Sequence, residues 1–436
     1  MNLLKDILAN DVYPALGCTE PTSCAYAAAV AASHLGEPVR RLVLRADPGT
    51  YKNGAAVTVP QSDGAKGNLV AAAMGAVLAR PEDELMLLDA VTPDVLRRAN
   101  ALLDAGACRS ECLEDLTTFR VEAELAGDEH TACCVLAGSH THVERIEKDG
   151  RPLPVTGGGS ADGGTDEAPS LAYREALRQT NLRSLLAAAE TLDDDDRAYL
   201  QQGVEMNLAM AERGFEVGRT ACQLQRMNRA GFLADDLFFR TKLQVASAVD
   251  ARMAGIPQAV MTSGGSGNQG IVAILTPYCV GRETRVDDGR ILQSIAVAHM
   301  VNAYVKCFVG ELSVICGCAM AAGVASAVAI VYQQLGIDLN KIALAVANVI
   351  GDLGGLICDG AKPGCAMKTV TAVDTALRSG LMALEGYGVG PEDGVVGHDA
   401  EASIRNLGRI TLEGMFQVDP TVLRILQEKS RASGRP

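Results

Sequence analysis

The sequence predicts an α+β protein, in which an N-terminal half of mixed helices and strands precedes a mostly α-helical half. Alternating hydrophobic segments, which are typical of strands, are concentrated in the first part of the chain, whereas helical periodicity continues almost to the C-terminus. Hydrophobic residues make up 48% of the 436 residues, but aromatic residues only 4%. A core of small aliphatic side chains, together with 45 glycines, favours closely packed helices over a sandwich or barrel.

The elements of the first half are predicted from periodicity and from turn residues. A break at Pro14–Gly17 divides the helical texture of residues 1–35, and the segment YKNG at 51–54 is most simply a hairpin turn. Residues 84–90 fit either a helix or a strand. The remaining predictions are strands at 40–47, 55–60, 117–127 and 129–150, and helices at 67–80 and 91–106.

A Gly-rich acidic segment at 154–168 separates the two halves and predicts domains at 1–160 and 161–436, with the first helices free to pack on the second domain. Residues 312–332 carry no charge, but they lack basic flanks and predict a buried central helix rather than a membrane span. The other helices of the second half are predicted at 170–192, 195–218, 235–255, 290–310, 339–355 and 370–386. Irregular segments at 262–270, 309–318 and 354–368 interrupt them and are where chemistry is expected.

Charge and cysteine usage limit the function classes. The net charge is −14 and no basic patch stands out, which argues against nucleic acid or an anionic membrane as a partner. The 13 cysteines are an odd number in a chain whose first residues form no apolar leader, so we expect reduced thiols in the cytoplasm. Many thiols also suit metal or redox chemistry, although a buried Cys often only packs as a small hydrophobe.

Two of the irregular segments carry paired cysteines. GELSVICGCAM supplies Cys316 and Cys318, and GGLICDGAKPGCAMK supplies Cys358 and Cys365. Thiolates in flexible loops suit iron, because free backbone N–H groups there can bond cluster sulfurs. Core packing and zinc binding are the alternatives, and the spacing alone does not choose between them.

The segment MTSGGSGNQG matches the G-x-G-x-x-G dinucleotide pattern, but its surroundings lack a βαβ unit. A Ser/Gly nest that opens onto a helix explains it better, because free N–H groups there bind a carboxylate; a plain turn is the alternative. The residues of this predicted substrate site are Ser263, Gly264, Gly265, Ser266, Gly267 and Asn268.

Further polar residues complete the candidate site. In ALGCTEP, Cys18 lies just before a helix, where a thiolate is favoured, and Glu20 is a candidate acid or base; a structural cap is the alternative for both. Lys52 and Asn53 of YKNG could bind the substrate carboxylate or amine. His299 is either a hydrogen-bonded core residue or a general base. His140 and His142 alternate on a predicted strand.

Taken in order, ALGCTEP, YKNG, TSGGSGNQG, GELSVICGC and GGLICDGAKPGCAMK resemble the L-cysteine desulfidase family, which is related to the iron–sulfur L-serine dehydratases. The resemblance spans nearly the whole chain. It implies a [4Fe–4S] cluster held by three thiolates, with Cys358 and Cys365 as two ligands. The third is Cys318, which the following C-A-M-A-A stretch favours, or Cys316, which the distance from GEL favours.

The resemblance also implies a reaction. An open iron position would bind the β-substituent, and a base would remove the α-proton, so that L-cysteine gives pyruvate, ammonia and sulfide without pyridoxal phosphate. Cys18 is the residue that the resemblance brings near the active site, and Lys52 is a further catalytic candidate. Serine dehydration on the same cluster, a non-catalytic iron–sulfur or thiol sensor and a zinc-stabilised binding protein are the alternatives. A homodimer is an unsurprising assembly.

Overall fold

The computed structural model describes residues 2–116, 118–155, 169–310 and 312–432, and it confirms the α+β class. The helices of the first half are α1 (Leu3–Asp11), α2 (Thr19–Leu35), α3 (Pro48–Gly54), α4 (Asn68–Leu78), the 3-10 segment η1 (Pro81–Ala90) and α5 (Pro93–Asp104). Its strands are β1 (Pro14–Leu16), β2 (Arg41–Ala46), β3 (Cys108–Cys112), β4 (Arg120–Ala126), β5 (Thr131–Ala137), β6 (Val143–Lys148) and β7 (Arg151–Leu153).

Six of these strands form one sheet in the order β3-β2-β4-β5-β6-β7, with β2 and β3 parallel and all other neighbours antiparallel. Strand β4 alternates as predicted, because Val121, Ala123 and Leu125 are buried. Helix α2 covers this face and packs against α4 so closely that a Cβ on Gly75 would lie 2.0 Å from the carbonyl oxygen of Ala25. The small residues of the sequence therefore serve backbone-to-backbone helix contacts.

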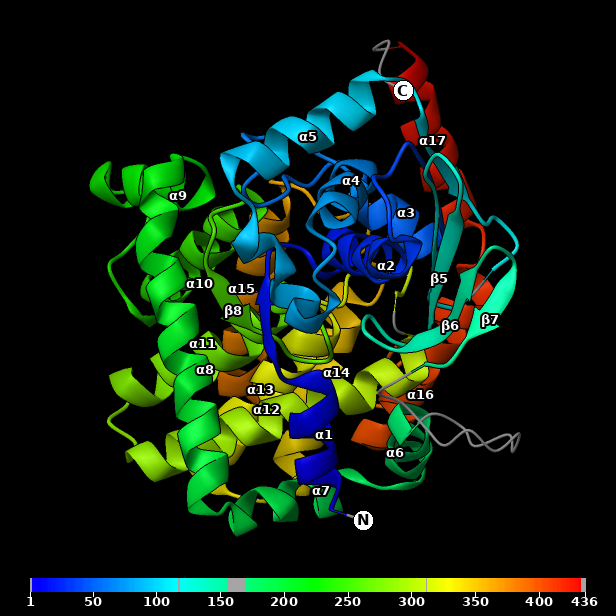
Figure 1. Ribbon diagram of the computed structural model, residues 1–436. Helices are drawn as coiled ribbons and strands as arrows, with labels where there is room; N and C mark the ends of the chain where they lie inside the picture. The colour runs from blue at the N-terminus through cyan, green and yellow to red at the C-terminus, as the bar shows by residue number, and fades with distance from the viewer. Residues whose placement is uncertain (1, 117, 156–168, 311, 433–436) are drawn as a thin grey trace.

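The second half is helical apart from one short strand. Its elements are α6 (Pro169–Gln179), α7 (Leu182–Ala188), η2 (Ala189–Thr191), α8 (Asp194–Arg213), η3 (Gly214–Val217), α9 (Thr220–Arg229), α10 (Leu237–Met253), β8 (Ala259–Met261), α11 (Gly267–Glu283), α12 (Asp288–Val309), α13 (Ala321–Leu335), α14 (Leu339–Leu353), α15 (Cys365–Leu384), α16 (Ala400–Arg409), the π-helical segment η4 (Ile410–Gly414) and α17 (Val418–Ala432). Helices α10 to α15 pack against one another as a single body, with α2 to α4 and strands β5 to β7 on another side of the molecule (Figure 1).

Two apolar helices lie at the centre of this body. Helix α12 is the one described helix whose length and composition would suit a membrane span, yet 83% of its apolar window is buried within the fold, as in a core helix. Helix α13 is buried almost throughout. The uncharged run 312–332 was predicted to be a buried central helix, with an irregular segment at 309–318. Both are confirmed, although the helix, α13, begins only at Ala321.

The N-terminus joins the two halves. Helix α1 packs against α6 and α12, and its Leu4 and Ile7 belong to the same hydrophobic core as the helical half. Strand β1 pairs antiparallel with β8, residue Pro14 opposite Met261. A second core lies between α2, α4 and the six-stranded sheet. Most of the predicted linker, 156–168, lies outside the described residues, so the division at 160 stays a prediction.

Three sequence predictions in the first half differ from the structure. Residues 51–54 are the end of helix α3 instead of a hairpin turn, because Asp47 caps the helix by accepting the Thr50 N–H and Pro48 occupies its first position. Residues 55–60 form no strand beyond a single bridge at Thr58. The predicted strand 129–150 is two strands, β5 and β6, and His140 and His142 lie in the loop between them.

Candidate active site

All five motif segments meet at one cavity with about 800 Å³ of empty space, part of it open to solvent. The cavity lies where the N-terminal helices face the starts of α11 and α15. The predicted site residues that line it are Cys18, Glu20, Asn53, Gly264, Gly265, Ser266, Asn268, Cys316, Cys318, Cys358 and Cys365. Lys52, Ser263, Gly267 and His299 do not line it.

The β1–β8 pair connects two of these segments. Strand β1 runs directly into Gly17 and Cys18, and β8 runs directly into Thr262 and Ser263; because the pair is antiparallel, the two segments leave it at opposite ends, and Cys18 and Gly264 line the cavity from different directions. Gly17 has a φ of +75°, and a Cβ there would lie 2.5 Å from Pro60 Cγ. Only glycine therefore allows the chain to turn from β1 into the cavity at this point.

Residues 263–266 form a tight turn instead of an open nest. Gly264 and Gly265 both have positive φ, and Ser263 and Ser266 exchange backbone hydrogen bonds across the turn, as in a hairpin turn of type I′. The Gly265 N–H is also taken, because it donates to the Asp11 carbonyl. The N–H groups that could still bind an anion are therefore those at the start of α11. Among the described residues, the N–H groups of residues 267–269 have no acceptor. The dinucleotide interpretation fails, since β8 pairs antiparallel and starts no parallel βαβ unit.

A polar row on α12 holds the turn from behind. Asn302 Nδ2 donates to Ser263 Oγ at 3.0 Å, His299 Nδ1 lies 2.9 Å from the same oxygen, and Lys306 Nζ donates to the Gly264 carbonyl. His299 is 1% exposed, and burial lowers its pKa to about 3. This side chain is therefore neutral and positions Ser263 without reaching the cavity.

Cys18, Glu20 and Asn53 form a hydrogen-bonded chain on the N-terminal wall. The Cys18 thiol donates to Glu20 Oε2 at 2.8 Å, and Asn53 Nδ2 donates to Glu20 Oε1 at 3.0 Å. Burial and the Glu20 charge raise the pKa of Cys18 well above its usual value. Burial disfavours the Glu20 carboxylate, but His140, the bond from Cys18 and Arg252 together lower its pKa. The expected Cys18 thiolate is thus wrong: the pair is a thiol and a carboxylate.

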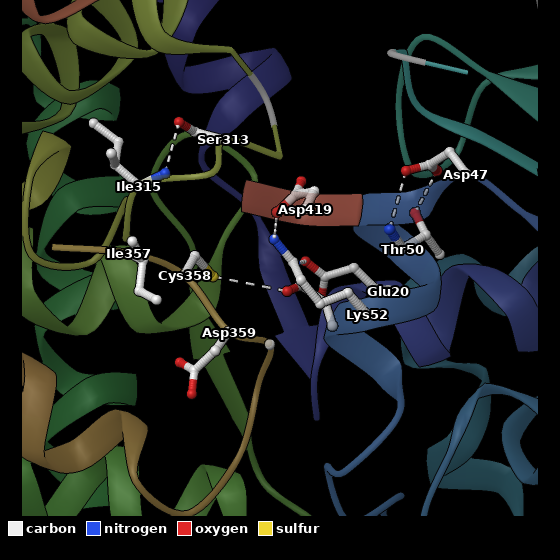
Figure 2. A network of polar contacts seen from close by, with 12 residues as sticks. Glu20, Asp47, Thr50, Lys52, Ser313, Ile315, Ile357, Cys358, Asp359 and Asp419 are labelled. Atoms are coloured by element: carbon white, nitrogen blue, oxygen red, sulfur yellow. Dashed lines mark hydrogen bonds and ion pairs between the residues drawn. The ribbon is translucent and has the colours of Figure 1, made fainter. Parts of the chain in front are cut away.

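The cysteine-bearing segments are paired with each other. Cys316 N–H donates to the Leu356 carbonyl at 2.8 Å and Cys358 N–H donates to the Val314 carbonyl at 2.7 Å, around an antiparallel bridge between Ile315 and Ile357. In such a ladder Cys316 and Cys358 point to the same face as diagonal neighbours, about 7–8 Å apart. Figure 2 shows Cys358 facing the N-terminal helices, where its thiol lies 3.8 Å from Asn53 Oδ1.

The four thiols differ in their surroundings. Cys316 is 5% exposed, and its pKa is lowered to about 6, mainly because the Cys318 thiol donates a hydrogen bond to the Cys316 sulfur. The Ala319 N–H and the charge of Lys368 lower the pKa of Cys316 further. The hydrogen bond between the two thiols and burial raise the pKa of Cys318. Burial raises the pKa of Cys365 to about 11. Within the described chain, no three His, Cys, Asp or Glu side chains converge closely enough to hold one metal ion.

Lys52 was predicted to bind the substrate, and the structure contradicts this. Its side chain is 1% exposed and does not line the cavity, and its ammonium pairs with Asp419 of α17 at 2.6 Å (Figure 2). The charge that sequence reasoning assigned to a substrate carboxylate is therefore used to hold the C-terminal helix on α3.

The cavity also contains residues that sequence reasoning did not select. Arg252, at the end of α10, resembled an ordinary C-terminal basic residue of a helix, and no local signal marks it. His140 reaches the cavity because Gly138, with a φ of +76°, ends β5 early; this glycine was the available signal. The other polar side chains of the lining are those of Thr19, Lys306, Ser313 and Lys368, together with Gln269 of the TSGGSGNQG segment.

Comparison with known proteins agrees with this arrangement. The family model described as the serine dehydratase alpha chain matches residues 82–424. The chain belongs to this family. It is also 47% identical to a UPF0597 protein of Geobacter sulfurreducens over 98% of this chain and 99% of that protein. A UPF0597 protein of Elusimicrobium minutum is 43% identical over 98% of this chain and 100% of the relative. The predicted relationship to the serine dehydratases is thereby confirmed, and family membership indicates a lyase of amino-acid catabolism.

Proposed function

We propose that the protein is an iron–sulfur lyase that removes the β-substituent of L-cysteine to give pyruvate, ammonia and sulfide, without pyridoxal phosphate. The observation that supports this most is the convergence of the thiols of Cys316, Cys318, Cys358 and Cys365, a thiol–carboxylate pair and a helix N-terminus on one cavity. L-Serine is the second candidate substrate, because the matching family model is named for serine dehydratase.

The donor set suits a cluster better than a single ion. Zinc requires its ligands to converge on one atom, and the described thiols, although they share one wall, do not do so. A multi-iron cluster accepts thiolates that are further apart, and the thiols lie in irregular segments that leave backbone N–H groups near them. When bound, a cluster with three thiolate ligands would supply an open iron as Lewis acid for the β-substituent.

Cys318, Cys358 and Cys365 are the ligands that we propose, with Cys316 as the alternative to Cys318. Cys318, Cys358 and Cys365 are partly exposed at the cavity, whereas Cys316 is 5% exposed. Single alanine variants at Cys316 and Cys318, compared by iron and acid-labile sulfide content after anaerobic reconstitution, separate the two alternatives.

The Cys18–Glu20 pair can carry the proton chemistry. The Glu20 carboxylate accepts the α-proton, and the Cys18 thiol donates a proton to the departing sulfide. The proton on Glu20 then returns to Cys18 across the 2.8 Å contact between them. The aminoacrylate that is released reacts with water to give pyruvate and ammonia. No pyridoxal phosphate lysine is needed, since the α-proton is lost without a Schiff base.

We propose the small amino acid as the partner, without nucleic acid or membrane, and the reducing cytoplasm as the compartment. All 13 cysteines lie in the described ranges and are free, which supports a reducing compartment. A homodimer is the assembly that we would test first, by light scattering of the cluster-loaded protein.

The decisive experiment is anaerobic purification and reconstitution, an ultraviolet–visible spectrum, and assays of sulfide and pyruvate with L-cysteine and L-serine. We expect cluster absorbance, turnover of L-cysteine above L-serine, and loss of both absorbance and turnover in Cys358→Ala. Full turnover by iron-free protein would refute the proposal. Cluster colour without turnover would favour the sensor, and zinc in the purified protein would favour a zinc-stabilised binding protein.

A further inference from the structure

Arg252 is a buried cation whose donors are not used within the protein. Its side chain lies at the end of α10 and is 2% exposed. Nη1 donates to Asn268 Oδ1 at 2.9 Å, whereas Nε and Nη2 are buried without a hydrogen-bond partner among the described residues. Buried charged donors without an acceptor are costly, so a structure that retains them implies a ligand for them.

The unused donors point to the start of α11. A Cβ added to Gly267 would lie 2.4 Å from Arg252 Nε and 2.8 Å from Nη2, so the guanidinium occupies the space beside the first residue of that helix. The α11 N-cap, Ser266, makes no side-chain capping bond. The positive end of a helix of 17 residues and a guanidinium group thus face the same part of the cavity.

The other cavity lysines are committed to protein acceptors. Lys306 donates to the Gly264 carbonyl, and Lys368 donates to the Ile357 carbonyl at 2.7 Å and pairs with Asp359. No Asp or Glu of the described chain forms an ion pair with Arg252, although its charge lowers the pKa of Glu20 through space. The Nε and Nη2 groups of Arg252 therefore lack an anionic partner within the described chain, and a ligand from outside the protein can supply it.

We propose that Arg252 and the first turn of α11 bind the α-carboxylate of the substrate. A guanidinium fork matches a planar carboxylate with two parallel bonds, and the helix N–H groups supply further donors. Gln269 of the same turn lies against the Cys316–Cys318 segment, because a Cβ on Gly317 would lie 2.6 Å from its Nε2. A carboxylate held at this corner would present the β-substituent to the thiol-lined wall. The inference rests on the proposed function and adds the residue that selects carboxylate-bearing substrates.

The test measures binding separately from turnover. L-Alanine has no β-substituent to lose, so its binding to cluster-loaded protein is measured by anaerobic titration calorimetry, with L-alaninamide as the ligand that lacks the carboxylate. We expect Arg252→Gln to bind L-alanine roughly 30-fold or more weakly, as for loss of one partner of a buried charge pair. Arg252→Lys should give an intermediate loss, because it keeps the charge without the fork. Binding of L-alaninamide should be weak in all three proteins.

Two further variants keep the result interpretable. Arg240→Gln lies on the same helix, in an exposed ion pair with Asp235, and should bind L-alanine like the wild type. Gly267→Ala keeps Arg252 but places a methyl group where the Arg252 guanidinium lies, so it should also weaken the binding of L-alanine. If Arg252→Gln and Gly267→Ala bind L-alanine as tightly as the wild type while L-cysteine is turned over, the carboxylate assignment is overturned and the proposed reaction stands. If the wild type binds L-alanine through Arg252 but eliminates nothing, the reaction fails and the carboxylate site stands.

Discussion

The ion pair between Lys52 and Asp419 gives a prediction that separates a structural role from a substrate-binding one. Lys52 is 1% exposed and Asp419 is 15% exposed, so neither charge is well hydrated without the other. Asp419→Asn keeps the size of the side chain but leaves a buried ammonium without a counter-charge. Breaking a buried pair in this way costs ~3–5 kcal/mol, and we expect the lower end, about 3 kcal/mol, because water still reaches Asp419.

The loss of stability should be local to the contact between α3 and α17, because these helices pack on each other and Lys52 lies on α3 (Figure 2). About 3 kcal/mol corresponds to a roughly 150-fold larger population of the locally open state, which amide hydrogen exchange can resolve. The assay is hydrogen exchange with mass spectrometry on peptides from residues 48–54 and 418–429. The Michaelis constant for the amino acid is measured on the same preparations and should change little.

Matched variants sharpen this test. Glu428→Gln removes an exposed acid from α17, and we expect it to leave exchange unchanged. The double variant Lys52→Met/Asp419→Leu removes both charges together and should recover most of the protection. If Lys52→Met raised the Michaelis constant about tenfold while α17 kept its protection, Lys52 would be a substrate ligand and the structural reasoning would be wrong.

Three further outcomes follow from the packing and electrostatics. Gly75→Ala forces a methyl group onto the Ala25 carbonyl and should cost about 1–3 kcal/mol of unfolding free energy in urea titration, whereas Gly323→Ala, whose nearest contact is 3.8 Å, should cost nothing. His299 has a pKa of about 3 in the folded protein, whereas a histidine in the unfolded chain has a pKa of ~6.5. Below pH ~6.5 the unfolded chain therefore binds one proton more, and the free energy of unfolding should fall as the pH drops. A pH series of denaturation curves should show a smaller fall in His299→Asn. Glu20→Gln should lower kcat roughly 100-fold or more with cluster absorbance retained, and near-normal turnover would exclude Glu20 as the base.

The sequence predicted most helices and the sheet core, because their apolar patterns are local. The prediction of secondary structure failed where a short helix-start motif stood beside a more prominent turn motif. The Asp47–Pro48 pair is a helix start, but the following YKNG dominated the interpretation. The SGGSG turn was predicted as an anion nest, because no local signal shows that the Gly265 N–H donates to the Asp11 carbonyl, far away in the sequence.

The sequence predicted some residues of the candidate site and missed others, depending on whether their role is visible from their neighbours in the sequence. Cysteine, glycine and the GCTEP segment attract attention in a sequence whatever their environment. Arg252 does not, because what sets it apart is the absence of an acidic partner in three dimensions, on a helix that reads as ordinary. Lys52 shows the reverse: it was selected from its neighbours in the sequence, although its partner Asp419 lies at the other end of the chain.

The division of the site along the chain bears on how this reaction could differ from that of other family members. The serine dehydratase alpha model matches residues 82–424, which contain the four cysteines of the two paired segments, Arg252 and the start of α11. Cys18, Glu20 and Asn53 lie before that match, yet they face the same cavity. Close backbone contacts hold the two parts in register: a Cβ on Gly360 would lie 2.5 Å from the Lys52 carbonyl oxygen, and φ is +94° there. Under the proposed reaction, the part that the family model matches would supply the thiols and the carboxylate site, and the first 81 residues would supply the proton chemistry. A preference for a thiol over a hydroxyl leaving group would then be decided in the first 81 residues.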